Sequence, residues 1–315
     1  MEKMNKEIEI LINNHPVRIE LAQGRTKPRV ACLGNEGTYT EAARYELLKN
    51  YLVDMDADFL TENSIVVQRV EAGDYDLGIV PVENAIGGDV VDVLRELNHI
   101  QNITVLGEKI LGIQHMLIGW PGEDIEEIYT HPQAMDQCQI FLSERYRNIK
   151  QNPTALSTAQ AVERVKSEKR VAAIASKRAA QINDVPILAE DIGDVKGNST
   201  RFLMIGRGET YPTGEDSTSL IFIPRGDRPG ILARCLTALA SYGINLTKLD
   251  SRPTGVMREY AFWVTMNGHY KDEMVKRGID DLKETYCKSL RILGSYGKAE
   301  LPEGVREPGI INGVS

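Results

Sequence analysis

The chain has 315 residues, of which 42% are hydrophobic and 26% are charged, and its formal net charge is −8. This length allows two or three domains with separate cores. The acidic balance argues against a nucleic-acid-binding protein, which would carry a basic face, but it does not exclude a small anionic ligand held by local arginines and backbone N–H groups.

Residues 1–28 are mixed and charged, with one alternating stretch, EIEILI, and we treat them as an N-terminal extension. From residue 29, short apolar segments alternate with segments of helical periodicity, which predicts βαβ units around a mostly parallel sheet. In chain order, we expect strands at 29–34 and 76–84 and helices at 38–52, 65–73 and 90–100, the second of these helices capped by Ser64.

The segment 103–120, ITVLGEKILGIQHMLIGW, is apolar in alternation, contains glycines and is predicted to cross from one lobe to another. A second series follows, with strands at 126–130 and 171–175 and helices at 132–146, 157–168 and 176–182. The chain then returns through 185–193 to a strand at 201–206. We therefore predict an α/β catalytic domain, 29–211, with lobe 1 at about 29–107 and 188–211, lobe 2 at about 108–187, and a ligand cleft between them.

A Gly/Pro/Ser/Thr-rich linker, RGETYPTGEDSTS, places a domain boundary near residue 212. Beyond it we expect strands at 218–224, 244–253, 258–268 and 289–297 and helices at 228–243 and 271–286. The order βαββαβ predicts a ferredoxin-like domain over 217–298, followed by a tail, 299–315.

The cysteines lie far apart among apolar neighbours, so we predict reduced, buried thiols: Cys32, Cys138, Cys235 and Cys287. Their spacing suits no zinc site, and neither a metal nor a cofactor is expected. The start, MEKMNKEIEI, has no apolar signal-peptide core, and no apolar run is long enough to span a membrane. A cytoplasmic protein is expected.

Polar residues follow several predicted strands, at the sheet edge where open α/β sheets bind ligands. Thr38 and Thr40 follow Gly34 and Gly37 at a helix start, which serves either as an anion site or as a plain helix cap. Asn84 closes another strand, and a turn asparagine explains it equally well.

The remaining two strand ends are YTHPQAMDQC and GNSTRF. In the first, His131 is a candidate general acid, although capping or packing is its more common use, and Gln133 and Gln137 share one helix face. The segments contain neither a Ser/His/Asp order nor a Walker loop. Spacing alone therefore indicates an enzyme or a binding protein for a small polar anion.

Taken in order, these segments closely resemble prephenate dehydratases. GNEGTYTEAA is similar to that family's GPEGTFTEAA, GIVPVENAIGG to G-x-x-P-x-E-N-S-x-E-G, and YTHPQAMDQC to SHPQA-x-x-QC. NSTRFLMIG contains the T-R-F signature, and STAQAV and AAIAS match further blocks. RPGILARCL and INLTKLDSRP resemble the PGAL and INLTKIESRP stretches of ACT regulatory domains, so the resemblance covers residues 29–298.

The resemblance implies a lyase of phenylalanine biosynthesis that converts prephenate to phenylpyruvate, water and carbon dioxide. It implies a two-lobed, periplasmic-binding-protein-like catalytic domain and a ferredoxin-like ACT domain. Thr200 would donate to the departing C4 oxygen within a polar network, because a free hydroxyl is a poor acid. The implied catalytic residues are Thr200, Asn84 and Gln137, and the implied substrate contacts are Thr38, Thr40, Thr130, Ser157, Thr158, Arg201 and Phe202.

The same resemblance implies feedback inhibition by L-phenylalanine bound between the ACT domains of two subunits, and hence a homodimer or homotetramer. The implied effector residues are Gly230, Ile231, Leu232, Asn245, Leu246, Asp250, Ser251, Arg252 and Pro253. No chorismate mutase domain is expected, because residues 1–28 are too short to form one.

Several residues depart from the family pattern. Ala85 stands where serine is usual, Gly87 where glutamate is usual, and Thr130 where serine is usual; Ile231 and Asp250 replace alanine and glutamate in the ACT region. The changes beside Asn84 keep open an arogenate dehydratase, whose substrate differs by an amino group. A non-catalytic amino-acid sensor derived from the family is the alternative from another class. The intact T-R-F argues against a non-aromatising prephenate decarboxylase.

Overall fold

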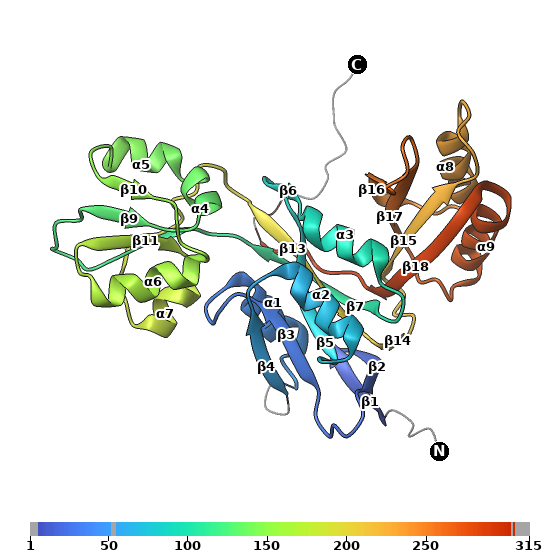
Figure 1. The fold of residues 1–315 in the computed structure, drawn as a ribbon, viewed down its shortest axis with the longest axis horizontal. Helices are drawn as coiled ribbons and strands as arrows, with labels where there is room; N and C mark the ends of the chain where they lie inside the picture. Colours follow the sequence, from blue (N-terminus) through green and yellow to red (C-terminus); the bar gives the residue numbers. More distant parts are fainter. Residues whose placement is uncertain (1–5, 52–54, 304, 306–315) are drawn as a thin grey trace.

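The structure is a computed structural model and describes residues 6–51, 55–303 and 305. Figure 1 shows two α/β lobes and a C-terminal domain, with lobe 1 in the middle. Lobe 1 contains a six-stranded sheet in the order β4-β3-β5-β13-β7, with the short β6 paired to β5. Its strands are β3 (Arg29–Leu33), β4 (Asp56–Leu60), β5 (Leu77–Asn84), β6 (Gly88–Asp89), β7 (Thr104–Gly112) and β13 (Ser199–Gly206).

The two faces of this sheet are covered by different helices. Alternate residues of each strand point to opposite faces, so Cys32 packs with Leu47 of α1 while Ala31 packs with Val66 of α2. The helices are α1 (Tyr39–Leu48), α2 (Asn63–Ala72) and α3 (Val91–His99). The expected cap of α2 was wrong: Ser64 lies inside the helix, whose N-cap residue is Glu62.

The N-terminal residues form a hairpin, β1 (Lys6–Ile12) and β2 (His15–Leu21), whose two-residue turn uses the positive φ angles of Asn13 and Asn14. β14 (Gly208–Thr210) pairs with β2, so the segment after β13 closes a three-stranded sheet. Apolar residues of the hairpin, such as Ile12 and Val17, join the core beneath α1. The extension is therefore an integral part of lobe 1.

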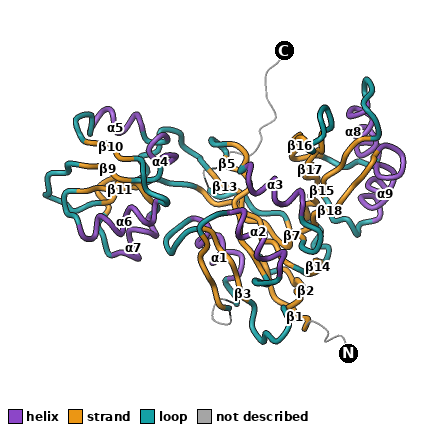
Figure 2. The backbone as a smooth tube through the Cα atoms, viewed as in Figure 1, coloured by secondary structure: helices purple, strands orange, loops and turns teal. Residues whose placement is uncertain are grey.

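Lobe 2 contains a five-stranded sheet in the order β10-β9-β11-β8-β12. Its strands are β8 (Met116–Ile118), β9 (Glu127–Tyr129), β10 (Lys150–Asn152), β11 (Val171–Ala175) and β12 (Ile187–Ala189), and its helices are α4 (Pro132–Asp136), α5 (Gln139–Arg145), α6 (Thr158–Ser167) and α7 (Lys177–Asn183). Figure 2 shows the two segments that connect it to lobe 1; they lie between β7 and β8 and between β12 and β13.

The expectation of mostly parallel sheets needs correction, because both sheets are mixed. In lobe 1, β4, β3 and β5 are parallel, but β13 runs antiparallel to both β5 and β7. In lobe 2, β10, β9 and β11 are parallel, while β8 is antiparallel to β11 and β12. Apart from the short β5–β6 pair, these antiparallel pairs involve the strands next to the two connections, where the chain enters or leaves a lobe.

The C-terminal domain has the βαββαβ order, with the antiparallel sheet β16-β17-β15-β18. Its elements are β15 (Asp216–Pro224), α8 (Ile231–Ser241), β16 (Leu246–Pro253), β17 (Tyr260–Asn267), α9 (Glu273–Asp281), a π-helical turn (Leu282–Tyr286) and β18 (Cys287–Gly297). Both helices cover one face. The other face joins the core of lobe 1, where Trp263 and Leu293 share a cluster with Leu94 of α3.

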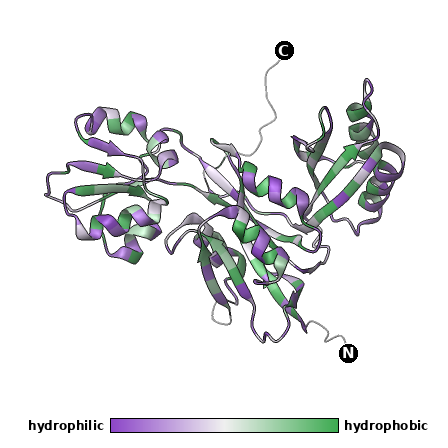
Figure 3. Ribbon diagram, in the orientation of Figure 1, coloured by the Kyte–Doolittle hydropathy of each residue, from purple (hydrophilic) through white to green (hydrophobic). Residues whose placement is uncertain are grey.

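Figure 3 shows apolar residues concentrated along the strands and hydrophilic residues on the outer helix faces. All four cysteines are buried and free, which confirms the prediction of reduced core thiols. Burial raises the pKa of Cys32, Cys138 and Cys287 to about 12 in each case. No helix in the described part of the chain is long and apolar enough to cross a membrane.

Candidate active site

The candidate site is centred on two neighbouring strands of lobe 1. Thr200 at the start of β13 lies opposite Asn84 at the end of β5, because the two strands are antiparallel. The Asn84 amide nitrogen lies 2.9 Å from the Thr200 hydroxyl oxygen. The antiparallel return of the chain therefore brings the T-R-F segment to the carboxyl end of a parallel strand, where α/β sheets bind ligands.

Asn84 is held on both sides of its amide. Its oxygen accepts the backbone N–H groups of Ile86, at 3.2 Å, and Gly87, at 2.7 Å. Its nitrogen also donates to the side-chain oxygen of Asn198, at 2.9 Å, and to the carbonyl oxygen of Ser199, at 3.0 Å. Asn84 is only 9% exposed, so its orientation is fixed by partners that do not depend on solvent.

Gln137 reaches the same network from lobe 2. Its side-chain oxygen accepts from Asn198 Nδ2 at 3.3 Å and lies 2.8 Å from His115 Nε2. Thr200, Asn84 and Gln137, the three predicted catalytic residues, are thus brought into one hydrogen-bonded chain through Asn198.

The single helix expected at 132–146 is two helices, and Gln137 lies at the break between α4 and α5. Asp194 causes this break: its N–H donates to the Gln137 carbonyl at 2.8 Å, and its carboxylate accepts from Ile140 N at 3.0 Å. Gln133 and Gln137 still lie one helical turn apart, because the Gln137 N–H donates to the Gln133 carbonyl at 3.1 Å, but the helix ends at Gln137.

Thr38 caps α1, as its hydroxyl accepts from Glu41 N at 3.3 Å and donates to Asn35 O at 2.9 Å. Thr40 is 5% exposed. The start of α1 also touches lobe 2: Ser176 donates to Gly37 O at 2.8 Å, and Arg178 forms an ion pair with Glu41 at 3.0 Å. The lobes are therefore in direct contact beside Thr38.

The predicted contacts from lobe 2 divide into two groups. Ser157 caps α6 by accepting from Gln160 N at 3.1 Å, and Thr158 is the first residue of that helix. Thr130 is fully buried and donates to Ile174 O at 2.7 Å, so its hydroxyl is not exposed to a cleft. His131 caps α4 through Nδ1, which is the capping use weighed above.

Arg201 and Phe202 are both engaged within the protein. Arg201 Nε donates to Glu108 at 2.7 Å, and its Nη2 donates to the hydroxyl of Tyr296 at 2.8 Å. Burial lowers the pKa of Arg201, but the adjacent Glu108 carboxylate outweighs this effect, so the net shift is upward. Phe202 is 2% exposed in the core beneath α1. Phe202 is therefore a core residue, whereas the Arg201 guanidinium is occupied by Glu108 and Tyr296.

The predicted effector residues lie at the two ends of the C-terminal sheet. Gly230 precedes α8 with a positive φ of 78°, and Ile231 and Leu232 begin that helix. Because β15 and β16 are both antiparallel to β17, the start of α8 lies at the same end as Pro253, with Asp250, Ser251 and Arg252 leading to it. Asn245 and Leu246 lie at the opposite end of β16.

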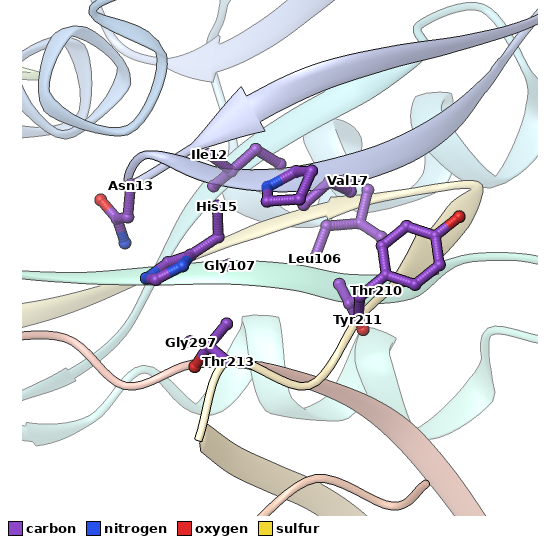
Figure 4. Close-up of a pocket in the computed structure, with 11 residues that line it drawn as sticks. Ile12, Asn13, His15, Val17, Leu106, Gly107, Thr210, Tyr211, Thr213 and Gly297 are labelled. Carbon is purple, nitrogen blue, oxygen red and sulfur yellow. The ribbon is translucent and has the colours of Figure 1, made fainter. Parts of the chain in front are cut away.

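Two cavities lie at the edges of lobe 1. A cavity of about 10 Å³ lies where the N-terminal hairpin, β7 and the linker at Thr210 meet (Figure 4); it has room for roughly one water molecule and marks a packing seam. A much larger cavity, of about 1250 Å³, lies between lobe 1 and the C-terminal domain. Ser199 and Arg201 line this cavity, whereas Thr200, which lies between them, is hydrogen-bonded to Asn84. Successive residues of β13 therefore have different surroundings.

Sequence reasoning missed His115, Asn198 as a network member, Glu108 and the Arg178–Glu41 contact. His115 carried a signal, as one of the polar residues of the mainly apolar connecting segment. Asn198 stands beside the T-R-F motif, but nothing in the motif indicated its partners. The other two depend on pairings across 93 and 137 residues, which no local pattern encodes.

Comparisons with known proteins identify the family to which the chain belongs. Residues 30–210 match the sequence profile of the prephenate dehydratase family. A bifunctional chorismate mutase/prephenate dehydratase from Stutzerimonas stutzeri is 38% identical over 278 residues, covering 87% of this chain and 74% of the relative. Arogenate dehydratase 1 from Petunia hybrida is 32% identical over 293 residues, covering 85% of this chain and 66% of the relative.

A crystal structure of prephenate dehydratase from Arthrobacter aurescens in complex with L-Phe is similar over the whole architecture. Its TM-score is 0.77 at 31% identity, and the match covers 86% of this chain and 90% of the other. The family profile alone spans more than half of the sequence, and the relatives extend the match through the C-terminal domain. The chain therefore belongs to the prephenate dehydratase family.

Proposed function

We propose that this protein converts prephenate to phenylpyruvate. The observation that carries the proposal is the 2.9 Å hydrogen bond between Asn84 Nδ2 and Thr200 Oγ1, at the sheet edge facing lobe 2. Asn84 donates this bond, so the Thr200 hydroxyl accepts it and its own hydrogen is free to point elsewhere. A threonine held as an outward donor is what a hydroxyl leaving group requires.

The reaction breaks two bonds that join substituents to the cyclohexadiene ring. The C1 carboxylate leaves as carbon dioxide, and the electron pair of its C–C bond completes the aromatic ring. The C4 hydroxyl leaves with its bonding pair and, with one proton, becomes water. Aromatisation makes the reaction strongly favourable, so the enzyme has mainly to orient the ring and stabilise the departing oxygen.

Thr200 is proposed to donate to this departing oxygen, and the Gln137 amide to supply a second donor. Substrate carboxylates are proposed to bind near the starts of α1 and α6, at Thr38, Ser157 and Thr158, where free N–H groups favour anions. Arg201 is proposed to act indirectly, because its bonds to Glu108 and Tyr296 hold β13 in position.

The proposal is tested by turnover of prephenate and arogenate at equal concentrations by the purified full chain. Formation of phenylpyruvate with a clear preference for prephenate is expected. A large preference for arogenate would transfer the assignment to arogenate dehydratase, the activity named for the Petunia relative. Binding of L-phenylalanine without turnover of either substrate would favour the amino-acid sensor.

We further propose regulation by L-phenylalanine through the C-terminal domain, as an ACT domain. The similarity to a dehydratase solved with L-Phe supports this. Gly230 and Asn245 lie at opposite ends of the sheet within one chain, so a pocket using both sets of residues requires a second subunit. A homodimer or homotetramer follows. L-Phenylalanine should lower activity and raise the thermal midpoint; if both stay unchanged, this domain does not bind it.

A further inference from the structure

The polarity of the hydrogen-bond chain at the site is fixed by the backbone. Asn84 Oδ1 faces the N–H groups of Ile86 and Gly87, at 3.2 and 2.7 Å. Backbone N–H groups can only donate, so the oxygen of the Asn84 amide must be the atom on that side. Its NH₂ group must therefore face Asn198 and Thr200.

This polarity passes along the chain from one side chain to the next. Asn84 Nδ2 donates to Asn198 Oδ1 at 2.9 Å, which leaves Asn198 Nδ2 to donate to Gln137 Oε1 at 3.3 Å. The same Gln137 oxygen lies 2.8 Å from His115 Nε2. Two donors thus meet one acceptor, and His115 must carry its hydrogen on Nε2.

The opposite atom of the Gln137 amide is left unused by the protein. Among the described residues, none accepts a hydrogen bond from Gln137 Nε2, and this nitrogen is not buried. His115 is only 6% exposed, and its Nδ1 is buried without a partner. The imidazole is therefore enclosed, and within the described part of the chain its one side-chain hydrogen bond joins Nε2 to Gln137.

We propose that His115 is a positioning residue for the dehydration: its Nε2–H fixes the Gln137 oxygen, so that the Gln137 NH₂ group faces the cleft as a donor. The proposal rests on the proposed function and extends it to a residue on the connection between the lobes. Without the His115 donor, the Gln137 oxygen keeps only the long 3.3 Å bond from Asn198. The amide is then free to rotate and present an oxygen to an anionic substrate.

Because His115 lies between the two lobes, its contact with Gln137 depends on how the lobes are arranged. His115 lies on the first connecting segment, and its carbonyl accepts from Ile192 N on the second at 2.8 Å. Gln137 belongs to lobe 2, and Asn84 belongs to lobe 1. One chain of bonds therefore runs through both lobes and both connections, and the donor orientation depends on their alignment.

The first experiment compares His115→Leu with His115→Gln, whose amide retains a donor near the Nε2 position. We expect His115→Leu to lower kcat by about 10- to 100-fold with KM within threefold, because one transition-state donor is misoriented. His115→Gln should recover most of this loss. An unchanged kcat in His115→Leu would overturn the proposal.

A double-mutant cycle separates positioning from a general structural role. In a Gln137→Met background, His115→Leu should change kcat by less than about twofold, because the side chain on which it acts is gone. An equal loss in both backgrounds would show that His115 acts on the fold and not through Gln137, and would refute the proposal.

A further measurement, of the His115 tautomer, needs neither turnover nor a variant. The ¹⁵N chemical shifts of the His115 imidazole in the full-length wild-type protein should show the neutral Nε2–H tautomer. An Nδ1–H tautomer would reverse the Gln137 amide and overturn the inference. A wild type that leaves prephenate unchanged would refute the proposed function, while the tautomer would still decide the polarity of the chain.

Discussion

The ammonium nitrogen of Lys248 lies 2.5 Å from Oδ1 of Asp89. The two residues join the C-terminal domain to the hairpin of β5 and β6, which carries Asn84. Lys248 also lies 3.0 Å from Glu83, the neighbour of Asn84, and Arg252 lies 2.7 Å from Asp89. The side chains of Lys248 and Asp89 are 14% and 20% exposed, so solvent screens their pair less than it screens exposed pairs. Lys248 and Glu83 also line the interdomain cavity. The predicted effector strand β16 thus contacts the β5–β6 hairpin directly.

Replacing Lys248 with Met should weaken inhibition by L-phenylalanine without preventing its binding. The ion pairs to Asp89 and Glu83 connect the effector strand to Asn84, and their loss should lower the coupling between the two ligands by about 5- to 20-fold. Inhibition curves at fixed prephenate, with effector binding followed by thermal shift, measure both quantities.

The matched control is Lys288→Met, whose lysine pairs with Glu259 inside the C-terminal domain at 2.5 Å. This variant should remain inhibited like the wild type. Equal inhibition of the Lys248 and Lys288 variants would contradict a coupling role for Lys248.

Thr200→Ala should lower kcat for prephenate by about 10²- to 10³-fold, because a donor to the departing oxygen is removed. Thr200→Ser keeps the hydroxyl and should retain most of the activity. Thr154→Ala, at an exposed threonine of lobe 2, provides a control for threonine loss. Full activity in Thr200→Ala would exclude this residue as the leaving-group donor.

Gly37→Ala should loosen the contact between the lobes. An added Cβ would lie 2.9 Å from the Ala179 Cα, and φ is +86°. Gly24→Ala is the matched control, because φ is +83° but nothing lies within 4 Å of the added Cβ. Both variants carry the left-handed backbone cost of about 1–2 kcal/mol, which unfolding curves will report. Only Gly37→Ala should raise KM, by roughly tenfold; equal KM values would show that this contact does not shape the site.

The stability of the protein should fall as the pH drops below about 6.5, and His269 should contribute to this fall. Burial lowers the pKa of His269 below its usual value. Its Nδ1 accepts Lys271 N at 3.1 Å, and its Nε2 lies 3.2 Å from a Thr210 hydroxyl that donates to Ser295 O. The neutral Nε2–H form satisfies both contacts, whereas a proton on Nδ1 would face the Lys271 N–H.

The sign follows from linkage. Below pH 6.5 the unfolded chain binds a proton at this histidine before the folded chain does, so acid favours unfolding and stability rises again with pH. The thermal midpoint of His269→Gln, which cannot titrate, should decline less between pH 7.5 and 5.5 than that of the wild type. A steeper decline in the variant would reverse the assigned direction.

Local sequence patterns determined the elements and the motif residues. The continuous apolar runs of β3 and β5 and the helical periodicity of α8 arise within each segment, so the two lobes and the βαββαβ order follow from neighbours in the chain. Thr200 and Asn84 were recognisable because their motifs are short and contiguous. The mixed strand direction of the sheets could not be recognised from the sequence, because strand direction depends on where a distant segment returns.

Tertiary structure alone decided what the site residues contact. Asp194 breaks the helix at Gln137 from 57 positions away along the chain, and Glu108 and Tyr296 accept hydrogen bonds from Arg201 from 93 and 95 positions away. Residues 6–21 join lobe 1 through the pairing of β2 with β14 and through apolar packing beneath α1, and both depend on distant segments. The sequence specifies which groups are present, but their hydrogen-bond polarity is set by distant partners, because each donor takes the acceptor that the fold brings within about 3 Å.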